Sequence, residues 1–264
     1  MLKIILWGGV ADKIIIEKPQ RKGFMSKLLL DKYSPYEKTI FIDADCLVGT
    51  NIDWWFEEFL NNNSDMSAFG RNIDAELTLK NPNAYYFKYT KCKYLGVEYI
   101  PSFNGGVYYF EKSDISHKVF SMAREFADKQ FDGGFLFYGD EPYLALAMSI
   151  NKCRCLPKHQ ILFYPRARQK IKYIDFRSEK YLYEQGGKEY DYLGVFHFGS
   201  NNTKRILYRY WVNDIVHRGN IIWEILYRTG FYKEMVYKID NFRDKIIHVL
   251  VEIKHSTVDK IKKQ

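Results

Sequence analysis

Residues 39–48 read TIFIDADCLV, and the predicted fold depends on this stretch. Four residues of mostly apolar character lead into Asp43, Ala44 and Asp45, and apolar residues resume at Leu47. This pattern predicts a buried strand that ends on two carboxylates. Such a pair costs desolvation and repels itself unless a cation lies between the two groups. Carboxylate oxygens suit a hard divalent ion, Mg²⁺ or Mn²⁺, that holds a diphosphate.

A second interpretation of the two aspartates stays open at this point. Asp is common where a strand turns into a loop, and it can cap a following helix. The sequence offers Asp53 as the cap of a helix over residues 53–62, which would free Asp43 and Asp45 from that duty. Spacing alone does not choose between a metal site and a simple strand end.

Length and composition bound the class of protein. With 264 residues and 47% hydrophobic residues, the chain can form one large domain, or one domain with an appendage. No apolar run approaches the roughly 20 residues that a membrane span needs, and no secretory signal is evident, so we expect a cytoplasmic protein. Four scattered cysteines predict reduced thiols. We interpret Cys153 and Cys155 as strand residues rather than metal ligands.

The positive charge is concentrated at the end of the chain. The net charge is +8, and residues 200–264 hold 13 Lys and Arg against 7 Asp and Glu. We therefore expect a main domain over residues 1–201 and a basic amphipathic helical tail over 202–264. The apolar stripes of the tail suit packing, and with Trp and Tyr among basic residues they also suit an anionic membrane surface. No nucleic-acid motif accompanies the charge, so no nucleic-acid partner is expected.

Alternating strands and helices predict an α/β fold. Strands over 2–7 and 13–17, a helix over 24–32 and the strand at 39–42 imply parallel pairing, with ligands at the carboxyl ends of the strands. We expect a mostly parallel, Rossmann-like sheet flanked by helices. Further expected elements are strands at 65–70, 153–163 and 173–175, a helix over 113–128 capped by Ser113, and an irregular segment at 73–94.

Three later stretches carry candidate site residues. Residues 102–110 read SFNGGVYYF, where Asn104, Gly105 and Gly106 indicate either close approach of a ligand or a bulge or tight turn. Residues 135–148 read FLFYGDEPYLALAM. Here Asp140 is a helix cap, or it joins Glu141 in contacting a sugar or an acceptor hydroxyl. In DYLGVFHFGS, residues 191–200, His197 is either a core histidine or a ligand that faces the site.

Taken together, FIDADCLV, FNGGVYYF, GDEPYLALAM and FHFGSNNTK resemble, in type and order, the GT-A fold glycosyltransferases, especially family 8 with glycogenin and galactosyltransferase-like enzymes. The resemblance covers roughly residues 23–204. It implies a nucleotide-diphosphosugar donor, in particular a UDP-sugar, and a glycan or glycolipid acceptor. It also implies Mn²⁺ or Mg²⁺ bound by Asp43, Asp45 and His197. A peripheral place on the inner membrane face would follow from the basic tail.

The resemblance implies roles for further residues. Asp140 and Glu141 would be catalytic, and the donor would be contacted by Lys27, Asp43, Ala44, Asn104, Gly105, Gly106 and Lys204. Only 42 residues precede Asp43, so we expect a shortened N-terminal part of this fold. The family commonly ends HxxGxxKP, whereas this chain reads HFGSNNTK, with Lys204 one place later than the lysine of the family. The family also tends to have Gln where Glu141 stands, and Glu141 could act as a general base in an inverting reaction, so both stereochemical outcomes stay open. The alternative function is a non-catalytic GT-A relative that binds a partner protein.

Overall fold

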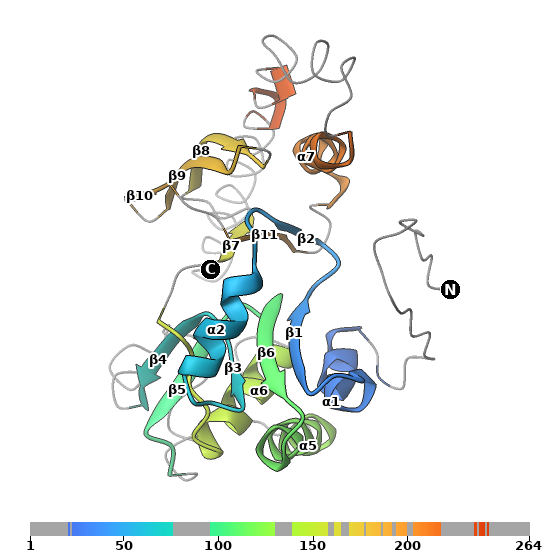
Figure 1. The fold of residues 1–264 in the computed structure, drawn as a ribbon, viewed down its shortest axis with the longest axis vertical. Coiled ribbons are helices and arrows are strands. Elements are labelled where there is room, and N and C mark those ends of the chain that lie inside the picture. Colours follow the sequence, from blue (N-terminus) through green and yellow to red (C-terminus); the bar gives the residue numbers. More distant parts are fainter. Residues whose placement is uncertain are drawn as a thin grey trace, which may run out of the picture. The chain divides into compact units, whose positions relative to one another are not determined.

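The computed structural model describes a defined part of the chain (Figure 1). The described residues are 21, 23–75, 96–129, 139–157, 161–164, 169–176, 178–185, 187–191, 194–199, 203–217, 235–236, 238–240 and 242. The strands expected at 2–7 and 13–17, most of the segment 73–94 and most of the tail lie outside them. The chain divides into two compact units, residues 1–40 with 62–157, and residues 41–61 with 158–264.

The described helices of the first unit are η1 (Gly23–Leu29), α1 (Leu30–Tyr33), α5 (Asp114–Asp128) and α6 (Asp140–Ile150). They include those predicted over residues 24–32, where the chain forms the 3-10 helix η1 followed by α1, and over 113–128. The predicted cap of α5 is confirmed, because the Ser113 hydroxyl accepts a 3.2 Å hydrogen bond from the Ser116 backbone N–H. The N-cap of α6 is Gly139, so Asp140 is the first helical residue and is not the cap.

The described strands of the first unit form two small sheets. They are β1 (Lys38–Ile42), β3 (Met66–Ser67), β4 (Gly70–Asp74), β5 (Tyr99–Phe103) and β6 (Val107–Glu111), ordered β1-β6-β3 and β4-β5. β6 runs antiparallel to β3. The Lys112 N–H donates a 2.8 Å hydrogen bond to the Glu37 carbonyl, which places the end of β6 beside the start of β1. These two strands therefore also run in opposite directions.

The core of the first unit is aromatic and explains the sequence of α6. Phe120 of α5 lies over Phe110 of β6 with ring centroids 5.2 Å apart, and it also contacts Tyr108. α6 packs against β5 and α5. Nearly every residue of α6 is buried, which is why DEPYLALAMSI is apolar all around rather than along one stripe.

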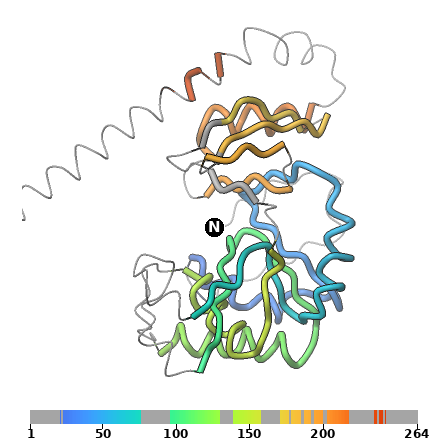
Figure 2. The backbone as a smooth tube through the Cα atoms, turned by 90° about the vertical axis from the view of Figure 1, so that its left-hand side faces the viewer, coloured from blue at the N-terminus to red at the C-terminus, as the bar shows by residue number. Residues whose placement is uncertain are grey.

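In the described part of the second unit, two further sheets and the helices α2 and α7 are defined. Its elements are β2 (Cys46–Val48), α2 (Asp53–Asn61), β7 (Ile161–Tyr164), β8 (Gln169–Asp175), β9 (Lys180–Gln185), β10 (Lys188–Tyr190), β11 (Val195–Phe198) and α7 (Ile206–Val216). The strand orders are β2-β11-β7 and β10-β9-β8, and the strands of the second sheet are drawn in gold in Figure 2. Asp53 begins α2 but does not cap it. Instead, the Asn51 side chain accepts a 2.8 Å hydrogen bond from the Asp53 N–H.

The α/β class is confirmed, while the strand directions differ from the prediction of a mostly parallel sheet. β11 runs parallel to β7, but the pairs β2/β11, β3/β6, β4/β5, β8/β9 and β9/β10 are antiparallel. β8, β9 and β10 follow one another in the chain with only a few residues between them, too few for the crossover helix that a parallel pair requires. The strand expected at 153–163 is also shorter, since β7 begins at Ile161 and Cys153 and Cys155 lie before it.

The start of the predicted tail belongs to the core of the second unit. Trp211 of α7 is fully buried, and its ring lies 4.7 Å from Phe196 and 5.6 Å from Phe198 of β11, centroid to centroid. Each such aromatic side chain buries a large apolar area, so α7 stabilises β11 directly. The division at residue 201 stays a prediction, but α7 is not a surface appendage.

A buried ion pair fixes a later segment of the tail within this unit. Arg205 and Asp240 have side chains 1% exposed each and form two hydrogen bonds, Nε to Oδ1 at 3.0 Å and Nη2 to Oδ2 at 2.6 Å. This bidentate geometry satisfies both charges.

Among the described residues, no helix has the length and apolar character needed to cross a bilayer.

Candidate metal site and the cluster around Gly105

The two aspartates of residues 39–48 lie in a tight turn. β1 ends at Ile42 and β2 begins at Cys46, whose N–H donates a 3.0 Å hydrogen bond to the Asp43 carbonyl. Ala44 and Asp45 therefore occupy the centre of a four-residue turn. The Phe198 N–H donates a 3.0 Å hydrogen bond to the Asp45 carbonyl, which extends the pairing with β11 to the residue just before the start of β2.

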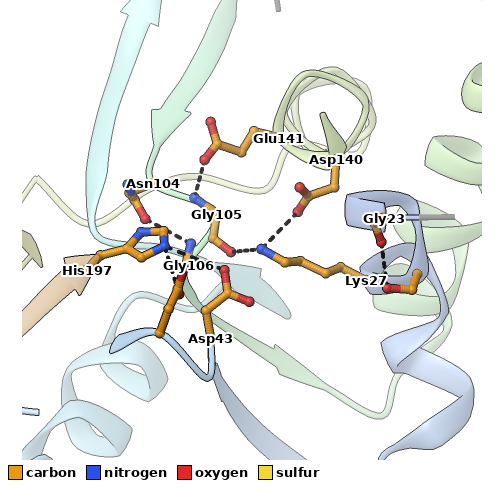
Figure 3. Close-up of polar contacts among 11 residues, drawn as sticks. Gly23, Lys27, Asp43, Asn104, Gly105, Gly106, Asp140, Glu141 and His197 are labelled. Atoms are coloured by element: carbon orange, nitrogen blue, oxygen red, sulfur yellow. Dashed lines mark hydrogen bonds and ion pairs between the residues drawn. The ribbon is translucent and has the colours of Figure 1, made fainter. Parts of the chain in front are cut away.

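This pairing brings His197 to the two carboxylates. His197 Nε2 lies 3.1 Å from Asp45 Oδ1 and 3.8 Å from Asp43 Oδ2, and Figure 3 shows the ring directed toward Asp43. His197 is 7% exposed, whereas the Asp43 and Asp45 side chains are 17% and 28% exposed. Of the two interpretations of His197, the structure favours the one in which the ring faces the acids. The role of these residues as metal ligands stays a prediction.

The spacing of these atoms fits a six-coordinate divalent ion. Metal–oxygen distances of about 2.1 Å place neighbouring ligands of an octahedral ion about 3.0 Å apart. The 3.1 Å between His197 Nε2 and Asp45 Oδ1 matches this value. The distance from His197 Nε2 to Asp43 Oδ2, 3.8 Å, exceeds it by less than 1 Å. Two carboxylates and a neutral imidazole suit Mn²⁺, while Mg²⁺ prefers an all-oxygen set.

Two residues near this cluster were missed in the sequence analysis. Cys46 offers a sulfur that lies, with an Asp45 oxygen and a His197 nitrogen, within a group whose atoms are all within 4.8 Å of one another. The sequence contained one signal for Cys46 as a candidate ligand, because this residue directly follows Asp45. Tyr208 of α7 has its pKa raised by burial, and the nearby Asp45 and Cys46 raise that pKa further. Tyr208 was missed because it lies in the region interpreted as a tail.

A second polar cluster surrounds Gly105 in the first unit (Figure 3). The Gly105 N–H donates a 2.6 Å hydrogen bond to Glu141 Oε1, and Lys27 Nζ donates a 3.1 Å hydrogen bond to the Gly105 carbonyl. Lys27 Nζ also lies 3.9 Å from Asp140 Oδ2, and both side chains are largely buried. Glu141 of α6 and Lys27 of η1 thus hold the N–H and the carbonyl of the same residue, Gly105. Acidic groups in the first turn of α6 also complement the helix dipole.

The glycines at 104–106 serve a turn between two sheets. β5 pairs with β4 and β6 with β3, and Asn104 Oδ1 accepts a 2.9 Å hydrogen bond from the Gly106 N–H. A Cβ at Gly105 would lie 2.6 Å from Glu141 Cγ, so only glycine fits there without displacing Glu141. The sequence predicted either a close ligand or a bulge or tight turn at residues 104–106, and the structure has a tight turn. The group that lies close to the Gly105 backbone is the Glu141 side chain.

The last two predicted donor contacts, Ala44 and Lys204, are exposed residues. Ala44 is exposed at the tip of its turn, and Lys204 is exposed just before the buried Arg205. Their predicted contacts with a donor stay predictions. The cluster at Asp43, Asp45 and His197 belongs to the second unit, and the cluster at Gly105 belongs to the first.

Comparison with known proteins gives a structural match and no sequence match. No protein-family model matches the chain, and no curated protein matches it by sequence. Among solved structures, the chain is similar to the galactosyltransferase LgtC in complex with donor and acceptor sugar analogs, at 16% identity and a TM-score of 0.41. The match covers 67% of this chain and 58% of that chain. Because the TM-score lies below 0.5, the function proposed below rests on the residues of this chain.

Proposed function

We propose that this protein is a metal-dependent glycosyltransferase of the GT-A type that moves a sugar from a nucleotide-diphosphosugar, in particular a UDP-sugar, to a glycan or glycolipid. One observation carries the proposal. His197, from β11, lies 3.1 Å from Asp45 in the Asp-x-Asp turn, so three groups able to ligate a divalent ion gather in one place. The four motifs in their family-like order support the same class.

The cluster of the second unit is assigned to the donor diphosphate. Asp43, Asp45 and His197 would hold Mn²⁺ or Mg²⁺, which when bound stabilises negative charge on a diphosphate leaving group. Asp43 and Asp45 neutralise part of the charge of the ion and set its position through the turn that holds them. His197 would ligate the ion through Nε2, the ring nitrogen that faces both carboxylates.

The cluster of the first unit is assigned to sugar and acceptor contacts. Glu141 and Asp140 lie in the first turn of α6, where a carboxylate can accept the proton of an acceptor hydroxyl. Glu141 Oε1 is held by the Gly105 N–H, which fixes the direction of the carboxylate. Lys27, which contacts the Gly105 carbonyl and Asp140, is assigned to donor groups because its ammonium group can pair with negative charge.

A screen of nucleotide sugars for Mn²⁺-dependent hydrolysis tests the proposal. We expect the wild type to hydrolyse at least one UDP-sugar, and Asp45→Asn to lose at least about 100-fold in rate, because loss of preorganised electrostatic stabilisation has that effect. Asp53→Asn on α2 is the matched control, since Asp53 is exposed and begins a helix. Absence of any metal-dependent nucleotide binding would overturn the proposal in favour of a non-catalytic, partner-binding relative.

We also propose that the basic end of the chain holds the protein on an anionic membrane surface, at the cytoplasmic face. Around the buried Arg205–Asp240 pair, the neighbouring residues Ile239 and Phe242 are 46% and 66% exposed. The exposed charges beside them, Lys204 and Lys238, are both basic. Exposed apolar side chains among lysines suit a bilayer interface with anionic lipids.

A further inference from the structure

We propose that Cys46 is a further ligand of the ion held by Asp45 and His197, and that it directs the site toward thiophilic divalent ions. The chemical class of preferred ion is borderline-soft, such as Zn²⁺ or Co²⁺, rather than Mg²⁺. This inference rests on the proposed function, because it concerns the same metal site. It adds a ligand and a metal preference that the Asp-x-Asp pattern alone does not contain.

The pairing of two strands places Cys46 beside His197. β2 and β11 run antiparallel, and Cys46 and His197 are direct partners in the register. Directly opposed residues project to the same face of a sheet with Cβ atoms about 5 Å apart. Cys46 and His197 therefore present their side chains on the face where Asp45 lies, and the three ligand atoms fall within 4.8 Å of one another.

The distances allow all three groups to reach one ion with small side-chain movements. Zinc–sulfur and zinc–nitrogen distances are about 2.3 Å and 2.0 Å, so tetrahedral ligands lie roughly 3.5 Å apart. The observed separations are at most 4.8 Å, and that between His197 Nε2 and Asp45 Oδ1 is already 3.1 Å. Rotation of the Cys46 side chain about its Cα–Cβ bond can close the remaining difference.

Cys46 differs from the other described cysteines in its surroundings. Cys153 and Cys155 are 2% exposed, and burial raises the pKa of both thiols, that of Cys155 to about 12. Cys46 is partly exposed and neighbours two metal-ligand candidates. Ligation converts its S–H to a thiolate, the sulfur–metal bond forms and the proton leaves to solvent.

The sulfur changes which ions the site prefers. Thiolate and imidazole ligands favour zinc-like ions, whereas Mg²⁺ binds oxygen and keeps its waters. A site with Asp45, His197 and Cys46 is therefore expected to bind Zn²⁺ or Co²⁺ more tightly than Mg²⁺, with Mn²⁺ between them. Asp43, 3.8 Å from His197 Nε2, supplies the additional oxygen.

Titration of the full chain with Co²⁺ tests the inference by absorption spectroscopy. We expect the wild type to show sulfur-to-cobalt charge-transfer absorption in the near ultraviolet together with the visible bands of bound Co²⁺. Cys46→Ser should lose the charge-transfer absorption, and competition titrations should show its Zn²⁺-to-Mg²⁺ affinity ratio fall by about tenfold or more. Cys153→Ser is the matched control and should keep the wild-type spectrum.

The outcomes separate this inference from the proposed function. Wild-type visible bands without charge-transfer absorption, or a Cys46→Ser spectrum equal to that of the wild type, would overturn the role of Cys46 while leaving the Asp-x-Asp metal site intact. Failure of the wild type to bind Co²⁺ and Mn²⁺ at all would overturn both. Circular dichroism of each variant, compared with that of the wild type, confirms that the fold is retained.

Discussion

The backbone N–H of Gly105 donates a 2.6 Å hydrogen bond to Glu141 Oε1, which joins the turn between β5 and β6 to the first turn of α6. A Cβ at residue 105 would lie 2.6 Å from Glu141 Cγ and 3.0 Å from Oε1. We therefore expect Gly105→Ala to lower the free energy of unfolding by about 1–3 kcal/mol, as overpacking does. Urea denaturation measures this change.

A second substitution identifies the clash as the cause. Glu141→Ala removes Cγ and the carboxylate, so Gly105→Ala should cost clearly less in the Glu141→Ala background than in the wild type. Equal costs in both backgrounds would show that the contact with Glu141 does not explain the glycine.

The ion pairs Arg205–Asp240 and Arg21–Asp128 have the same 2.6 Å nitrogen–oxygen distance. They differ in burial, because Arg205–Asp240 is buried and the Asp128 side chain is exposed. Asp240→Asn leaves a buried arginine without its carboxylate, so we expect a loss of about 3–5 kcal/mol in the free energy of unfolding. The Asp128 side chain is 62% exposed, so Asp128→Asn should cost at most about 1 kcal/mol. Similar losses in the two variants, measured by urea denaturation, would contradict the buried anchoring of residues 238–240.

Thiol reactivity should separate Cys46 from Cys155. Burial raises the pKa of the Cys155 thiol from its ordinary value near 9 to about 12, so its thiolate is scarce at pH 8. We expect iodoacetamide to label Cys46 first in the native protein, as followed by peptide mass mapping. Because the folded pKa is raised, the stabilisation associated with Cys155 is present below pH 9 and is lost as the pH rises toward 12. Fast native labelling of Cys155 would contradict its burial.

The proposed membrane surface has a matched control in the first unit. Ile239 and Ile115 are 46% and 44% exposed, but Ile239 lies among basic residues near Phe242, and Ile115 lies on α5. We expect Ile239→Glu to reduce co-sedimentation with phosphatidylserine-containing vesicles several-fold and Ile115→Glu to leave it unchanged. Equal binding of both variants, or equal binding to neutral vesicles, would exclude this surface.

Much of the fold could be predicted because local patterns determine it. The β-branched run before Asp43 becomes β1, although its residues are at most partly buried and not fully buried as predicted. Ser113 caps α5, as its side-chain oxygen allows. Strand direction was harder, because a run of apolar residues has the same appearance in parallel and antiparallel sheets. The interpretation of residues 202–264 as a tail missed Trp211, since an apolar stripe does not say which core it fills.

The candidate site was predictable in its residue types but not in its contacts. Asp43 and Asp45 stand out as charges at the end of an apolar strand, and His197 as one polar residue in VFHF. Their proximity depends on the register of β2 and β11, which no local pattern specifies. The same register places Cys46 opposite His197. The hydrogen bonds of Gly105 with Lys27 and Glu141 likewise join residues far apart in the sequence, so no local pattern predicts them.

The central claim, that Asp43, Asp45 and His197 hold a divalent ion that binds a diphosphate, is tested most directly by calorimetry with UDP. We expect UDP to bind the wild type only when Mn²⁺ is present, and Asp45→Asn to lose this binding while its circular dichroism stays that of the wild type. UDP binding that does not depend on Mn²⁺, or that is equally strong in Asp45→Asn, would contradict the claim.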